Sequence, residues 1–197
     1  MVGFYLLCRG GEIVADGGSA GQGPLKCEDV QLWHVNEHGR RCSATVSGGR
    51  VNVATFHWRF SKNDQCGRGQ ERAAGATGAA TCPVMAVASA KQRQAGKGKG
   101  GADTLFPKVS HNSLRSWIKQ SARVALKPNA SRFSNHGVRR GGACAFFFAG
   151  ASEYELCYQG RWSMHARGTQ GRYAVPTLQR IIRLTPHMAK EFTSLGY

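Results

Sequence analysis

The chain has 197 residues, and its hydrophobic content of 41% is enough for one sizeable core or two small ones. Its 27 Lys and Arg against 11 Asp and Glu give a net charge of +16, which favours a polyanionic partner. No run reaches the ~20 apolar residues of a membrane span, and no signal peptide or lipidation signal is present. We therefore expect an intracellular protein that binds nucleic acid rather than a membrane.

The seven cysteines are scattered, and none forms a Cys-x-x-Cys pair. Zinc-ribbon spacing is therefore absent. An odd number of cysteines without a secretory signal indicates reduced thiols rather than a disulfide framework. We expect neither a metal nor a cofactor.

The first half of the chain predicts a small antiparallel sheet of three strands. Residues 2–15 carry apolar residues at helical spacing, and residues 16–24 form a glycine-rich loop. Residues 30–35 and 50–60 are rich in β-branched and aromatic residues, which is typical of strands, and a third strand is expected after the turn at 63–69.

The second half predicts helices. Proline in the first turn favours a helix over 82–92, and an apolar stripe predicts another over 113–126. A third is expected from about 138 to 149, ended by Gly150, and a Ser152–Glu155 capping box opens a fourth. The basic, glycine-rich loop at 95–103 is either a solvated linker or a phosphate contact. The expected fold is α+β and mainly helical.

Residues 135–173 hold the most specific pattern. His136 and Arg139 form His-x-x-Arg, a helix then ends at Gly150, and Trp162 of "GRWS" follows Arg139 by 23 residues. This pattern resembles the C-terminal catalytic domain of the tyrosine recombinase (phage integrase) family. "CRGGE" (8–12) resembles the family's first arginine motif, and "FSKNDQCGRG" (60–69) resembles the hairpin of its catalytic lysine. Segments 81–87 and 105–107 resemble those that follow, so the resemblance covers nearly the whole chain.

The resemblance implies a function for each matched residue. Tyr173 would attack a DNA phosphate and form a 3′-phosphotyrosine, while Arg9 and Arg139 would hold the non-bridging oxygens. Lys62 would protonate the departing 5′-oxygen, and His136 would act as general base. The catalytic set is thus Arg9, Lys62, His136, Arg139, Trp162 and Tyr173. The residues expected at the DNA are Glu12, Arg68, Lys97, Lys99, Arg140, Arg161 and Arg172.

Taken singly, these residues have ordinary structural interpretations, such as a surface arginine or a half-buried tyrosine. Their order along the chain is what favours catalysis. The interval from Trp162 to Tyr173 is 11 residues, a couple more than the family usually shows, so either the helix of the nucleophile is shifted or another tyrosine attacks. Tyr158 lies too early for this role, and Tyr197 would need a long reach. We expect one catalytic domain over 1–197, without the N-terminal domain that clamps DNA in this family.

The resemblance also implies partners and a location. Double-stranded DNA is the expected substrate, with self-association into a tetramer on it, in the nucleus or the bacterial nucleoid. Three alternatives stay open. The chain could be an inactive DNA-binding remnant of the same fold, or a type IB topoisomerase, which shares the chemistry. A basic ribosomal or RNA-binding protein explains the charge but not the ordered residues, and the aromatic motifs of RNA recognition are absent.

Overall fold

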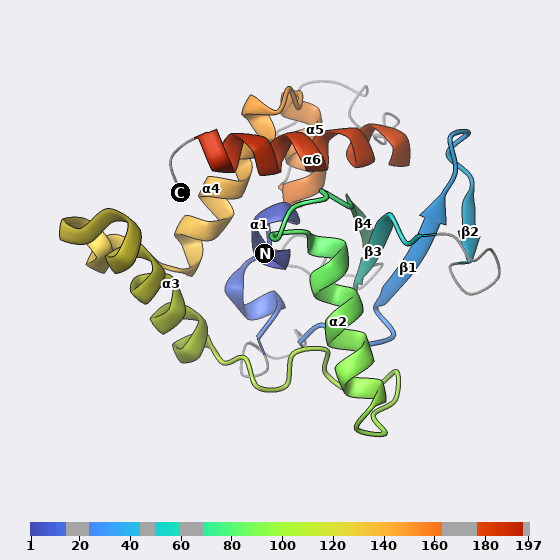
Figure 1. Cartoon of the computed structure of the whole chain (residues 1–197), viewed down its shortest axis with the longest axis horizontal. Helices are drawn as coiled ribbons and strands as arrows, with labels where there is room; N and C mark the ends of the chain where they lie inside the picture. Colours follow the sequence, from blue (N-terminus) through green and yellow to red (C-terminus); the bar gives the residue numbers. More distant parts are fainter. Residues whose placement is uncertain (15–23, 44–49, 60–68, 163–176, 195–197) are drawn as a thin grey trace.

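The computed structural model describes residues 1–14, 24–43, 50–59, 69–162 and 177–194, and these form a mixed α+β structure (Figure 1). The first half contains α1 (Val2–Tyr5), the 3₁₀ turn η1 (Gly10–Glu12), β1 (Val30–Val35), β2 (Arg41–Ser43), β3 (Val53–Trp58) and β4 (Gln70–Gly75). The second half contains α2 (Pro83–Ala95), α3 (His111–Leu126), the 3₁₀ segment η2 (Lys127–Arg132), α4 (Asn135–Phe148), α5 (Glu153–Gly160) and α6 (Leu178–Ser194). In these ranges no helix is long and apolar enough to cross a membrane.

Over the described ranges the sheet has four strands in the order β2-β1-β3-β4, all antiparallel, so the prediction of three strands was wrong. The additional strand, β2, has only three residues and pairs Arg41 with Val35 across a turn at Gly39. Gly39 has φ +77°, a conformation that favours glycine. A short, polar edge strand of this kind carries no alternating apolar pattern, which is why the sequence did not reveal it.

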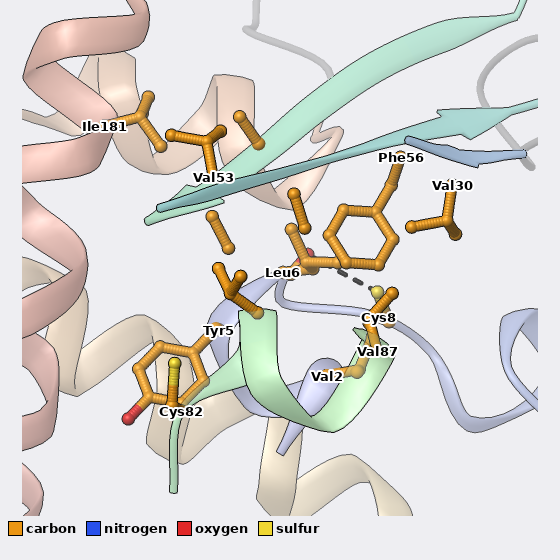
Figure 2. Packing of buried hydrophobic residues seen from close by; sticks show 14 of the residues in the cluster. Val2, Tyr5, Leu6, Cys8, Val30, Val53, Phe56, Cys82, Val87 and Ile181 are labelled. Atoms are coloured by element: carbon orange, nitrogen blue, oxygen red, sulfur yellow. Dashed lines mark hydrogen bonds between the residues drawn. The ribbon is translucent and has the colours of Figure 1, made fainter. Parts of the chain in front are cut away.

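The two faces of the sheet pack on different helices. On one face, Phe56 packs with Leu6 after α1 and with Val87 of α2, as Figure 2 shows. On the other face, α6 lies close against β4, because a Cβ at Gly75 would lie 2.9 Å from the backbone of Ile182. The Gly75 N–H also donates to Thr185 Oγ1 at 3.1 Å. The glycine therefore sets how closely α6 covers the sheet.

The expected helix over 2–15 is interrupted. α1 ends at Tyr5, and Leu7 has φ +49°, a strained conformation for a leucine. Leu6 and Leu7 are both fully buried, so the chain turns to place both side chains in the core. This turn leaves Arg9 extended at the start of η1 rather than inside a helix.

The four helices predicted from the second half are present. Pro83 opens α2, and α3 ends at Leu126 as expected, although η2 follows it directly. Gly150 follows α4 with φ +91°. The capping box of α5 is formed, because Ser152 N–H donates to Glu155 Oε2 at 2.7 Å and Ser152 Oγ accepts from Glu155 N–H at 3.2 Å.

The loop at 95–103 is held by hydrogen bonds. Lys99 N–H donates to the carbonyl of Gln94 at 3.0 Å, and Cys27 N–H donates to the carbonyl of Asp103 at 2.9 Å. Lys99 also makes an ion pair with Asp103 at 3.7 Å. The loop therefore lies against residues 26–29, at the C-terminal end of α2.

Candidate functional site

Three arginines from distant segments, Arg9, Arg139 and Arg161, lie around Glu12, and a fourth, Arg72, lies close enough to Arg161 to be affected by its charge. Arg9 precedes η1, Arg72 lies in β4, Arg139 lies in α4, and Arg161 directly follows α5. Burial lowers the pKa of Arg139, and the charges of Arg161 and Arg9 lower it further. Burial also lowers the pKa of Arg72 to about 10, with a further contribution from Arg161. We call these four residues and Glu12 the arginine cluster.

Glu12 is the carboxylate of this cluster, and its side chain is buried. Its Oε2 accepts from the backbone N–H of Arg9 at 2.6 Å and from Nη2 of Arg161 at 2.5 Å. Its Oε1 lies 3.8 Å from Nη1 of Arg9. Four guanidiniums and one carboxylate leave a formal charge of +3 on the cluster. Such an excess of positive charge favours an anionic ligand.

Arg139 has an unused hydrogen-bond donor. Its Nη2 donates to the carbonyl of Gly160 at 2.6 Å, and its guanidinium lies 5.2 Å from the ring centre of Trp162. Its Nη1 is buried and has no hydrogen-bond partner among the described residues. Because a buried donor without a partner is costly, Nη1 of Arg139 is suited to donate a hydrogen bond to an acceptor on a ligand.

Arg161 fixes the turn between α5 and Trp162. Its φ of +55° is rare for a residue other than glycine. The guanidinium lies 4.6 Å from the ring centre of Trp58, and the Glu12 ion pair holds it from the other side. A Cβ at Gly160 would lie 2.8 Å from the Trp162 ring, so only glycine allows the tryptophan to fold back here.

Arg72 and Cys8 belong to this region, although the sequence did not reveal either of them. Nε of Arg72 donates to the carbonyl of Tyr158 at 2.5 Å, and its guanidinium lies 3.8 Å from the Tyr158 ring centre. The sequence offered one indication of Arg72, because this arginine directly precedes two alanines, Ala73 and Ala74, in the segment predicted as a strand. Burial raises the pKa of the Cys8 thiol to about 12, so the thiol is neutral and adds no charge.

The structure brings some predicted site residues together and leaves others apart. Arg9, Glu12, Arg139, Arg161 and Trp162 meet in the cluster. His136 is exposed on α4, one turn before Arg139, and Arg140 is exposed on the same helix. Lys97 and Lys99 are exposed in the loop after α2. Four predicted residues lie outside the described ranges: Lys62, Arg68, Arg172 and Tyr173.

A second basic feature is the outward side of α3. Arg115, Lys119 and Arg123 follow one another at helical spacing, and none of them has an ion pair within the described ranges. The exposed residues beside them include the polar Asn112, Ser116 and Gln120 and also the apolar Trp117 and Val124. No Asp or Glu occurs between residues 104 and 152. This side of α3 is therefore suited to a phosphate backbone, and we call it the α3 surface.

Comparison with protein-family models, with curated proteins and with solved structures found no match for this chain. Among the described residues, no group of three or more His, Cys, Asp or Glu side chains is placed to hold a metal ion.

Proposed function

We propose that the chain is the catalytic domain of a tyrosine recombinase, which cleaves and rejoins DNA in site-specific recombination or integration. The observation that supports the proposal is that Arg9, Arg139 and Trp162 lie together in one positively charged cluster, although they are far apart in the sequence. Each was expected there from the resemblance alone. Packing does not by itself gather buried arginines, because burial of unpaired cations is unfavourable.

The first step of the proposed reaction is binding of the scissile phosphate. Arg9 is partly exposed, and Arg139 has a free Nη1 donor, so both can donate to the non-bridging oxygens. The planar guanidinium suits a phosphoryl group that gains negative charge in the transition state. The Trp162 indole, beside Arg139, would pack against the same phosphate.

The second step is transfer of the phosphate. Tyr173 would attack phosphorus as the nucleophile, and the bond to the 5′-oxygen would break. Lys62 would give the departing oxygen its proton, and His136, one turn from Arg139, would take the tyrosine proton. The phosphotyrosine retains the energy of the broken bond, so a strand hydroxyl can reverse the step without ATP. Strand exchange would then follow in a tetramer assembled on DNA.

The remaining part of the proposal concerns how the duplex is held. The α3 surface carries three cations that make no ion pair with the described part of the chain, and Arg140 of α4 is exposed as well. Contacts of this kind to phosphates position a duplex, and Asn or Gln side chains between them can read base edges. A DNA-binding protein with this fold but without cleavage is the second candidate, favoured by the long interval between Trp162 and Tyr173.

A nicked suicide duplex separates the two candidates, because loss of the fragment beyond the nick traps a covalent intermediate. We expect a protein–DNA adduct that survives denaturing electrophoresis. Since the target sequence is unknown, the substrate is a library of random duplexes. Arg139→Ala should form no adduct, whereas Arg180→Ala, a change of equal charge in α6, should form it normally. DNA binding without any adduct would favour the inactive protein. Adduct formation followed by relaxation of supercoiled plasmid, without recombinants, would favour the topoisomerase.

A further inference from the structure

Glu12 lies within reach of more than one arginine, and this raises the question of which one it neutralises. It makes the 2.5 Å ion pair with Arg161, while the Arg9 guanidinium stands 3.8 Å away. It is also near enough to Arg139 to raise the pKa of that residue, against the larger effects of burial and Arg161. An arginine whose charge is neutralised by Glu12 attracts a bound phosphate less strongly, and this applies to both Arg9 and Arg139.

We propose that Arg161 is a positioning residue that holds Glu12 away from Arg9 and Arg139, so that these two arginines keep their charge for a phosphodiester. This inference rests on the phosphate site of the proposed function. Arg161 itself acts indirectly, because its Nη2 donates to Glu12 and its guanidinium lies against the Trp58 ring.

The geometry around Arg161 explains why it can hold the carboxylate in place. Trp58 stacks on the guanidinium, and the left-handed backbone at Arg161 directs the side chain inward from the end of α5. Glu12 is held from its own side, because Oε2 also accepts the backbone N–H of Arg9. Both members of the pair are therefore held from two sides, and breaking a buried, hydrogen-bonded pair of this kind is strongly destabilising.

If Arg161 is removed, the Glu12 carboxylate should form an ion pair with Arg9 instead. A buried carboxylate cannot stay unpaired at low cost, and Arg9 is the next cation, only 3.8 Å away. Arg9 would turn inward to pair with it and would leave the phosphate. Loss of one charge-assisted contact corresponds to roughly a tenfold to hundredfold weaker complex. If Glu12 is then made neutral, Arg9 should be released and binding should return.

A double-mutant cycle tests this coupling. The variants are Glu12→Gln, Arg161→Gly and the double variant, and the probe is a labelled 30-base-pair duplex of random sequence at fixed salt. Glycine suits the φ of +55° at this position. Arg161→Gly should bind at least tenfold more weakly than wild type, and the double variant should bind within threefold of wild type. Arg180→Gln, which also removes the cation from an Arg–Glu pair, is the matched control and should change affinity less than threefold.

If Arg161 only maintains the fold, the double variant will bind as weakly as Arg161→Gly, and the inference fails. If Arg139→Ala binds as tightly as wild type, the phosphate site of the proposed function fails instead. If Arg161→Gly and a second variant, Arg161→Gln, both unfold, the double variants with Glu12→Gln decide the question. A folded double variant with wild-type affinity supports the inference, and one with the affinity of Arg139→Ala refutes it.

Discussion

Replacing Arg139 or Arg161 by methionine should separate a ligand-binding arginine from a structural one. Both residues are buried, each with 5% of its surface exposed, but they differ in their partners. Arg161 makes an ion pair with Glu12, whereas Arg139 has no ion pair with a carboxylate among the described residues. The two arginines are equally buried, and within the described ranges only Arg161 has a carboxylate partner. The two substitutions therefore compare a paired with an unpaired buried arginine.

The cost of Arg139→Met is the sum of opposing effects. It removes the hydrogen bond to Gly160, worth about 1.5–3 kcal/mol, and the contact with Trp162, worth about 1 kcal/mol. It also relieves the burial of a cation, a penalty of several kcal/mol, and its repulsion by Arg161. The lowered pKa of Arg139 indicates that the surroundings disfavour its charge. We therefore expect the free energy of unfolding to change by no more than about 1 kcal/mol.

Arg161→Met should be much more destabilising, because it leaves the buried carboxylate of Glu12 without its closest partner. Breaking a buried pair costs about 3–5 kcal/mol, and we expect the lower end because Arg9 still donates to the same carboxylate. A difference of about 3 kcal/mol corresponds to about 6–12 °C in Tm for a chain of this size.

Thermal and urea unfolding, both followed by circular dichroism, measure this difference. We expect Arg139→Met to melt near the wild-type temperature while losing DNA affinity, and Arg161→Met to melt well below it. Equal losses of stability, or a larger loss in Arg139→Met, would show that Arg139 is held for the fold rather than for a ligand. That result would refute the reasoning from unequal pairing.

Three further predictions concern the nucleophile, the basic loop and the thiols. Tyr173→Phe should abolish the covalent adduct and leave DNA affinity within about twofold, since only a hydroxyl is lost; adduct mapped by mass spectrometry to another tyrosine would contradict this. Replacing Lys97 and Lys99 by alanine should lower affinity equally for all sequences and reduce the slope of log K against log salt by about 1–2, measured by anisotropy; an unchanged slope would exclude this loop from the interface. Iodoacetamide at pH 8.5 should label exposed Cys144 in the folded protein but not Cys8, whose pKa is raised to about 12 by burial; rapid native labelling of Cys8 would contradict its placement. Since the raised pKa lies above the unfolded value, the stability that Cys8 contributes should be lost between about pH 9 and 12.

The sequence by itself determined the elements whose signals are local. Pro83 marks the start of α2, Gly150 follows α4 in the conformation that only glycine adopts readily, and Ser152 and Glu155 cap α5 through their own side chains. Each signal involves residues within a few positions of each other, so its geometry does not depend on the rest of the fold. The sequence also shows the order of Arg9, Arg139 and Trp162 along the chain, but it does not show that the three residues lie close together in the fold.

Only the tertiary structure decided features whose cause lies far away in the sequence. β2 exists because β1 offers it a pairing edge, and α1 ends early because the core takes both Leu6 and Leu7. Arg161 joins the arginine cluster because the end of α5 lies beside Glu12, and Arg72 joins it because β4 packs against α5 near Arg161. No spacing along the chain predicts either contact. A pattern specifies which residue types are present, whereas the energy of a buried charge depends on what folding places around it.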